Sequence, residues 1–161
     1  MARDLSSLLD HTNTVISLEP IDDKATDANG TAAALSTFTG EGVTIVAVVG
    51  TSGFTPTSSN KLELEVEESV DGGSNYTDVA NANLTRVALT TAGAAATNAG
   101  CFAVIDDPAR DVHVYSTTYL RTSKSVTHIR VVHNFSGTVT GGIPIATFIT
   151  QAHPAIAPTA A

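Results

Sequence analysis

Lys61-Leu-Glu-Leu-Glu-Val-Glu-Glu-Ser69 alternates between charged and apolar side chains from its first residue to Glu67. Because successive side chains of a β-strand point to opposite faces, Leu62, Leu64 and Val66 share one face and the charged residues share the other. A helical period of 3.6 would instead spread the apolar residues around the whole cylinder. The stretch therefore predicts a half-buried antiparallel strand with one dry face and one acidic face in contact with water.

The two faces of this strand lead to opposite expectations for mutants. Leu64→Asp would place an unpaired charge on the dry face and should unfold or strongly destabilise the domain. Glu65→Lys changes a residue on the acidic face and should alter the free energy of unfolding by no more than about 0.5 kcal/mol. We interpret the carboxylates of Glu63, Glu65 and Glu67 as a solvated strand surface rather than as catalytic acids.

Turn signals and further apolar runs continue the pattern along the chain. Asp71-Gly-Gly-Ser-Asn75 contains glycines that permit positive φ angles, which indicates a tight turn after the strand expected at residues 61–69. The run Val43–Val49 is apolar apart from Thr44 and predicts a central strand covered on both faces. A short strand at residues 15–18 is expected to stop at Pro20, before a turn-rich loop at residues 20–30. Further strands are expected at residues 84–90, 101–105, 112–120, 126–135 and 143–150.

Length and composition are typical of one β-rich domain. The chain has 161 residues, of which 15% are charged, and its single cysteine, Cys101, allows no intrachain disulfide. About eight short strands separated by turns predict an all-β fold, an antiparallel β-sandwich or jelly-roll-like barrel over residues 14–152. Residues 1–13 are expected to form a short N-terminal arm and residues 153–161 an extended Pro/Ala tail.

The net charge of −8 limits the class of partners. The eight Lys and Arg residues are scattered along the chain, whereas proteins that bind nucleic acid cluster basic side chains to neutralise phosphates. No run of residues is long and apolar enough to span a membrane, and residues 1–4 lack the basic start of a signal peptide. We therefore expect neither direct nucleic-acid binding nor membrane insertion.

Histidines and acidic loops are weak candidates for a metal site. His128 and His133 lie an odd number of residues apart on one expected strand, so they should face opposite sides of the sheet. The segment Asp71–Asp78 lacks the alternating ligands, central glycine and terminal Glu of an EF-hand loop, and a hairpin turn is the preferred interpretation. The aspartates at residues 22–27 could bind a cation weakly, with a plain loop again preferred. We expect neither a metal nor a cofactor.

The sequence lacks the motifs typical of an enzyme. Cys101 lies beside Phe102 in an apolar run, which indicates a buried side chain rather than a nucleophile. The motifs G-x-S-x-G and H-E-x-x-H and the phosphate-binding loop of nucleotide hydrolases do not occur. Three tyrosines and no tryptophan leave few aromatic platforms for a carbohydrate ligand. A protein without catalytic residues is expected.

Several segments between Gly42 and Ala152 carry a resemblance to a known family. They are Val43–Gly50, Lys61–Ser69 with Asp71–Val79, Tyr119–Arg121, His128–Val132 and Ile145–Ile149. In this succession of strands, with its Asp-Gly turn and its strand containing Arg-Val, the chain resembles small β-rich virion proteins of tailed bacteriophages. These are head decoration or cement proteins, which bind the outer face of the assembled capsid.

This resemblance implies a structural protein of the virion, without catalysis, made in the host cytoplasm and located on the outer surface of the capsid. The implied partners are the major capsid protein and further copies of the chain itself. A homotrimer over the junctions between capsomers is the expected assembly. Another virion role, in the tail or neck, and a carbohydrate-binding module on the phage surface are the alternatives.

Three leucines near the N-terminus are the candidate contact residues. Leu5, Leu8 and Leu9 recur at helical spacing in a segment with little else to pack against. Burying them against a neighbour would contribute about 1.5–3 kcal/mol for each side chain. We therefore expect Leu5, Leu8 and Leu9 to contact the capsid or a neighbouring subunit, and a frayed end is the alternative for an isolated monomer.

Overall fold

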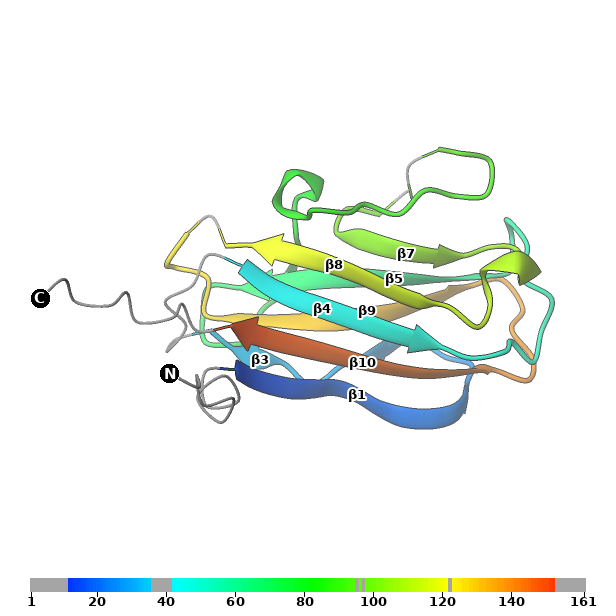
Figure 1. The fold of residues 1–161 in the computed structure, drawn as a ribbon, viewed down its shortest axis with the longest axis horizontal. Helices are drawn as coiled ribbons and strands as arrows, with labels where there is room; N and C mark the ends of the chain where they lie inside the picture. The colour runs from blue at the N-terminus through cyan, green and yellow to red at the C-terminus, as the bar shows by residue number, and fades with distance from the viewer. Residues whose placement is uncertain (1–11, 36–41, 95, 97, 122, 153–161) are drawn as a thin grey trace, which may run out of the picture.

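Two antiparallel sheets lie face to face in the computed structural model of the protein (Figure 1). The structure describes residues 12–35, 42–94, 96, 98–121 and 123–152. The all-β antiparallel sandwich predicted from the sequence is confirmed, whereas the jelly-roll connectivity stays a prediction. The elements are β1 (Thr12–Lys24), β2 (Ala28–Asn29), β3 (Ala33–Ala34), β4 (Gly42–Val49), β5 (Lys61–Ser69), β6 (Thr77–Asp78), β7 (Cys101–Ile105), β8 (Val114–Leu120), β9 (His128–Ser136) and β10 (Ile143–Ala152), with 3-10 turns η1 (Asn81–Asn83) and η2 (Pro108–Arg110).

Sheet A has the strand order β1-β10-β4-β8 and forms the front layer in Figure 1. Its centre is the pair β10 and β4, which stays in register from Ile145 opposite Val49 to Gln151 opposite Val43. The odd-numbered residues of β4 point into the molecule and are almost fully buried. Because side chains alternate along a strand and align across a sheet, the even-numbered residues of β4, β8 and β10 point outward.

Sheet B forms the second layer, in which β5 pairs with β9 along one edge and with β6 and β7 along the other. The short strands β2 and β3 extend this sheet by pairing with the far side of β9. The alternating stretch Lys61–Ser69 is thus β5, and it is antiparallel to β6, β7 and β9. Leu62, Leu64 and Val66 are fully buried in the core between the sheets, so its predicted dry face is confirmed.

The main hydrophobic core fills the space between the sheets, with Ile45 and Ile149 of sheet A packed in the same cluster as Leu64 and Ile129 of sheet B. A smaller cluster lies on the outer side of sheet B. It consists of Cys101 and Val104 from β7 together with Ala88 and Ala96. The residues 88–94, 96 and 98–100, hereafter the covering segment, therefore add a partial third layer on the outer side of sheet B.

The first strand is longer than the sequence predicted. β1 continues through Pro20 to Lys24, so the expected stop at Pro20 and the loop beginning there are wrong. Its pairing with β10 shifts register between Ile16 and Leu18, again before Ile21, and again before Lys24. β1 is an edge strand of sheet A, where a proline without an N–H is tolerated and bulges absorb the irregular pairing.

The expected strand at residues 84–90 is also wrong. Leu84 forms one isolated bridge with Tyr119 of β8, and the chain then leaves sheet A. The Ala88 N–H donates instead to the carbonyl oxygen of Cys101 at 2.9 Å. Residues 84–90 therefore connect β8 to β7 through single backbone contacts and form no continuous strand.

The predicted arm at residues 1–13 is too long by two residues, because Thr12 and Asn13 already pair with β10 as the start of β1. Residues 1–11 and the predicted Pro/Ala tail at residues 153–161 lie outside the described part of the chain. The contacts expected for Leu5, Leu8 and Leu9 therefore stay a prediction.

Candidate functional site

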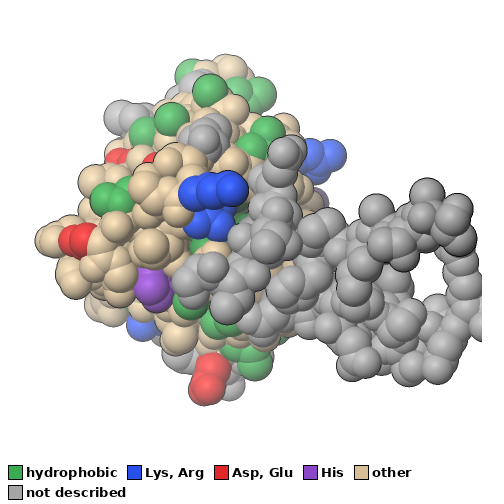
Figure 2. All heavy atoms as spheres, turned by 90° about the vertical axis from the view of Figure 1, so that its left-hand side faces the viewer, with side chains coloured by type: hydrophobic (Ala, Val, Ile, Leu, Met, Phe, Trp, Pro, Cys, Tyr) green, Lys and Arg blue, Asp and Glu red, His purple; other side chains and the backbone are tan. Residues whose placement is uncertain are grey.

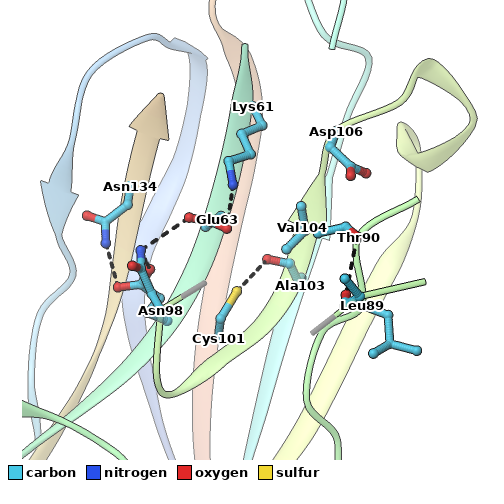
Figure 3. Close-up of polar contacts among 12 residues, drawn as sticks. Lys61, Glu63, Leu89, Thr90, Asn98, Cys101, Ala103, Val104, Asp106 and Asn134 are labelled. Carbon is cyan, nitrogen blue, oxygen red and sulfur yellow. Dashed lines mark hydrogen bonds and ion pairs between the residues drawn. The ribbon is translucent and has the colours of Figure 1, made fainter. Parts of the chain in front are cut away.

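The acidic face of β5 is covered, which corrects the prediction of a solvated surface. Glu63 and Glu65 are each only 3% exposed. Asn98 of the covering segment and Asn134 of β9 lie over them (Figure 3). Glu67, farther along the strand, matches the expectation better, because it is partly exposed and pairs with Arg130 at 2.6 Å. Alternation identified the two faces of β5 but not what lies above the acidic one.

Each oxygen of the two covered carboxylates has a partner. Lys61 Nζ lies 2.9 Å from Glu63 Oε1, and the Asn98 amide donates to Glu63 Oε2 at 3.1 Å. The same Asn98 nitrogen donates to Glu65 Oε1 at 2.5 Å, and the Asn134 amide donates to Glu65 Oε2 at 2.5 Å. Burial of a carboxylate is unfavourable unless its oxygens are paired. The cluster is therefore a clamp that fastens the covering segment to sheet B.

Burial raises the pKa of the Glu65 carboxyl, while the hydrogen bonds from Asn134 and Asn98 oppose the shift. The negative charges of Asp78 and Glu63 raise this pKa further. A general acid or base must come within hydrogen-bond reach of a reacting group. Both oxygens of Glu65 are occupied by side chains of the protein, so its raised pKa reflects enclosure rather than a catalytic task.

Cys101 lies beside this cluster and is fully buried, as predicted. Burial raises the pKa of its thiol to about 12, and the carboxylates of Glu63 and Glu65 add to the shift. The thiol donates to the carbonyl oxygen of Ala103 at 3.3 Å. Because the thiolate is the reactive form of cysteine, an enclosed thiol with this pKa serves packing.

The Asp71 carboxylate is used to build its own turn. Its Oδ1 accepts hydrogen bonds from the Ser69 hydroxyl and from the backbone N–H groups of Ser74 and Asn75, and its Oδ2 accepts one from the Asn75 side chain. These bonds, with the Asn75 N–H contributing most, hold the pKa of Asp71 well below its ordinary value. The turn returns the chain to pair β6 with β5, which confirms the hairpin interpretation.

The histidines of β9 point to opposite sides, as predicted. His133 is fully buried in the sandwich, whereas His128 is partly exposed. The Nδ1–H of His133 donates to the Ala28 carbonyl oxygen at 3.3 Å, and its Nε2 has no hydrogen-bond partner. Burial lowers the pKa of His133 to about 4. Within the described ranges, no three His, Cys, Asp or Glu residues lie close enough together to hold a metal ion.

The acidic segment at residues 22–27, which begins at the end of β1, is only partly described. The side chains of Asp22 and Asp23 lie outside the described part of the chain. Asp27 accepts a hydrogen bond from the Phe135 backbone N–H at 2.7 Å and so helps to tie the loop to the end of β9.

A hollow of about 540 Å³ lies beside Lys61 and Asp106. Lys61 is paired with Glu63, as described above. Asp106 accepts hydrogen bonds from the Thr91 N–H and hydroxyl at 2.8 and 2.7 Å. Its Oδ1 also lies 3.3 Å from the Nε atom of Arg110. These hydrogen bonds and the positive charge of Arg110 outweigh burial and lower the pKa of Asp106. The charged groups at the wall of this hollow therefore already have partners within the protein.

Sequence reasoning missed the outer face of sheet A. No described segment lies in front of this sheet in Figure 1. Val48 of β4 is 44% exposed, and Val114, directly opposite on β8, is 67% exposed. The prediction that residues 43–49 are covered on both faces is therefore wrong. β4 is central in its sheet, but the side chains that are fully enclosed lie on one side of it.

The outer face of sheet A carries no ionisable side chain on β10, β4 or β8. The signal was present in the sequence, because charge is missing from the outward positions of all three strands, but it required the register to be read. These positions are Pro144, Ala146, Phe148 and Thr150 on β10, Gly42, Thr44, Val46 and Val48 on β4, and Val114, Ser116, Thr118 and Leu120 on β8.

The end of the sandwich seen in Figure 2 has a different character. In the coloured part of that view, basic, acidic, histidine and hydrophobic side chains are interspersed, and neither sign of charge forms a continuous patch. The outer face of sheet A therefore contrasts with this end in having its outward positions on three adjacent strands free of charge.

Comparison with family models, with curated proteins and with solved structures found no match to this chain. Within the described residues, no helix has the length and apolar character needed to cross a membrane. What the protein does must therefore follow from its own surface and polar groups.

Proposed function

We propose that this protein is a structural component of a virion, which decorates the outer surface of a tailed-phage capsid and stabilises it by contact rather than by catalysis. The outer face of β10, β4 and β8 supports the proposal as a surface for contact with the shell or with neighbouring copies, because it is partly exposed and carries no charge on a two-layer scaffold. Exposed apolar side chains gathered in one patch, with charged residues depleted, are typical of protein–protein contact sites. The resemblance of residues 42–152 to decoration proteins favours the same role.

The polar groups of the protein support a role without catalysis. Glu63 and Glu65 hold the covering segment, Asp71 builds a turn, and Cys101 fills a small apolar cluster. Each group that resembles catalytic machinery in the sequence is thus occupied by the fold. Catalysis instead needs groups that are positioned for, and accessible to, a reacting molecule.

Stabilisation of a capsid by such a protein follows from mass action. A protein that binds the assembled lattice and not the free subunits lowers the free energy of the lattice, and contacts with several subunits add avidity. The net charge of −8 would steer the protein toward basic patches on the shell. The major capsid protein and further copies of the chain are the proposed partners, with the homotrimer expected from the family resemblance as one arrangement.

Sedimentation with purified capsids that lack the protein tests this function. The protein should sediment with assembled capsids, should not bind unassembled capsid protein, and should raise the temperature at which the capsids break open. A protein that neither sediments with capsids nor changes that temperature would contradict the proposal. A variant lacking residues 2–10 tests the arm separately, since reduced retention without loss of folding would assign a contact role to Leu5, Leu8 and Leu9.

A further inference from the structure

The outer face of sheet A has features that select one kind of partner. We propose that it binds the same face of a second copy of this chain and forms a reversible dimer with twofold symmetry. This inference rests on the proposed role of the face as a contact surface. It names the partner that this surface fits best.

Charge favours a second copy over a basic capsid surface. The chain has 16 acidic and 8 basic residues, so copies of it repel one another through their net charge. The outward positions of β10, β4 and β8 contribute none of these charges, and Glu19 on the edge strand β1 is an exposed carboxylate beside them. An acidic protein that docks on a basic shell presents carboxylates to it, and these strands present none. The matching surface is an uncharged one, which the same face of a second copy supplies.

Apolar side chains form rows across the sheet that can pack against their own copies. Ile16, Phe148 and Val46 lie opposite one another on β1, β10 and β4. Val48 and Val114 form the neighbouring row on β4 and β8. Seven large hydrophobic side chains are exposed in the described residues, and four of them, Ile16, Val48, Val114 and Leu120, belong to this face.

A row of threonines beside these apolar rows is self-complementary. Thr14, Thr150, Thr44 and Thr118 are in register across all four strands. The hydroxyl groups of Thr14 and Thr150 are already within 3.2 Å of each other. Because a hydroxyl group both donates and accepts hydrogen bonds, such a row can pair with an identical row, which a row of like charges cannot do.

The edges of sheet A are poorly suited to association by strand addition. β1 carries Pro20 and three register shifts, and such features block edge-to-edge pairing. On the other edge, the Thr85 N–H donates to the Thr118 carbonyl oxygen at 3.0 Å, and the Thr118 N–H donates to the Thr85 hydroxyl at 2.9 Å. Part of β8 is therefore already occupied, which leaves the face of the sheet as the surface for a second copy.

The size of the face sets the strength of the contact. Four strands about 4.8 Å apart, with seven residues rising about 3.4 Å each, cover roughly 450 Å² per copy, or roughly 900 Å² for two. Stable interfaces bury about 1,200–2,000 Å², so this dimer should form and dissociate with concentration. On a capsid, where bound copies are held close together, the same contact would gain from a high effective concentration.

The symmetry of this contact distinguishes it from the expected trimer. A surface that binds its own copy forms an isologous contact, which closes as a dimer. A homotrimer needs a heterologous contact between two different surfaces of each subunit. The oligomeric state therefore separates the two arrangements.

Sedimentation equilibrium of the full chain over a range of concentrations tests the dimer. The wild-type protein should shift reversibly from monomer to dimer. Val48→Lys places like charges in the contact, which should weaken the dimer and raise its dissociation constant at least about tenfold. Val70→Lys makes the same substitution at a 62% exposed valine after β5, away from sheet A, and should dimerise like the wild type.

A protein that is monomeric at every concentration, a trimer, or a dimer that Val48→Lys leaves intact overturns the inference. Circular dichroism at low concentration establishes that the variant is folded, and Thr44→Lys on the same strand replaces it if it is not. Retention on capsids is measured in parallel. A monomer that binds capsids contradicts the dimer but upholds the proposed function, whereas a Val48-dependent dimer that ignores capsids does the reverse.

Discussion

The outer faces of the two sheets place polar and apolar side chains in opposite ways. On β5 of sheet B, Glu63 and Glu65 are enclosed by amide groups, whereas on β4 of sheet A, Val48 lies exposed beside Val114 of β8. Alternation correctly sorted the residues of β5 into two sets. What lies above each face depends on segments that are distant in the sequence. A sheet face is thus dry or wet because of its cover as much as because of its side chains.

Among substitutions on the outer faces of the two sheets, reversal of one charge on the covered face should have the largest effect. Glu65→Lys removes the acceptor of the Asn98 and Asn134 amides and encloses an ammonium group among them. Unpaired buried donors and a buried charge should lower the free energy of unfolding by about 3 kcal/mol or more, which corrects the small effect expected from the sequence. Urea unfolding measures this change.

Glu19→Lys on the exposed edge of sheet A is the matched control for Glu65→Lys, and it should stay within about 0.5 kcal/mol of the wild type. Equal free energies of unfolding for the two variants would mean that the acidic face of β5 is open to water.

Acidification tests the polar group on the inner side of sheet B, where the cover is the core itself. The pKa of His133 is lowered from 6.5 to about 4 by burial, so the unfolded state takes up the proton first. The stability contributed by neutral His133 is therefore complete above pH 6.5 and is lost as the pH falls toward 4, by about 3 kcal/mol in total. The free energy of unfolding measured between pH 7 and pH 4 should show this loss.

His133→Gln separates this contribution from that of other groups, because its unfolding should lack the His133 part of the pH dependence. Glu65 acts in the opposite sense, since its raised pKa gives stability that is present at low pH and lost as the pH rises. Glu65 is retained in both proteins, so the difference between them reports His133 alone. An unchanged pH profile in the variant would contradict the burial of a neutral imidazole.

Removal of the clamp should have an intermediate effect. Asn98→Ala leaves one oxygen of Glu63 and one of Glu65 without a donor and should cost about 1–3 kcal/mol. Detachment of the covering segment should also increase hydrogen exchange at the Ala88 amide, which otherwise donates to Cys101, while the β4 amides stay protected. Exchange that rises equally at both places would show that Asn98 has no local role.

Substitution on the uncovered face should have the smallest effect on the monomer. Val48→Lys should change the free energy of unfolding by no more than about 0.5 kcal/mol at low concentration, because the side chain is already 44% exposed. Ile45→Lys on the same strand points into the core and should prevent folding. A large effect of Val48→Lys in dilute solution would mean that this face is covered.

Much of the fold follows from local patterns, and most of the candidate site does not. The alternation at residues 61–69 and the Asp71 turn act through neighbours in the sequence, so β5 and its hairpin were predictable. Asn98 is one amide in a segment without periodicity, and its role depends on two glutamates more than thirty residues away. Pro20 was misjudged for a similar reason, because its tolerance depends on the edge position of β1.

The outer face of sheet A was predictable in composition but not in arrangement. Thr44 is the single polar residue in residues 43–49, and this local run is typical of a strand enclosed on both sides. Recognition of the face requires the knowledge that β10 and β8 flank β4 and that their outward residues are uncharged as well. Neighbouring strands come from positions about 70 and 100 residues away, beyond the reach of any local pattern.

The order of strands in sheet A has a consequence for biosynthesis. β10 lies between β1 and β4, although it is the last of the described strands to be synthesised. All strands of sheet B have been synthesised once the chain reaches Ser136. One edge of β4, by contrast, has no partner until residues 143–152 have been synthesised as well. An unpaired strand edge recruits other chains, and long-range pairing is slow. A nascent or truncated chain that lacks β10 would therefore expose the β4 edge to its neighbours, which ties the solubility of this protein to the synthesis of residues 143–152.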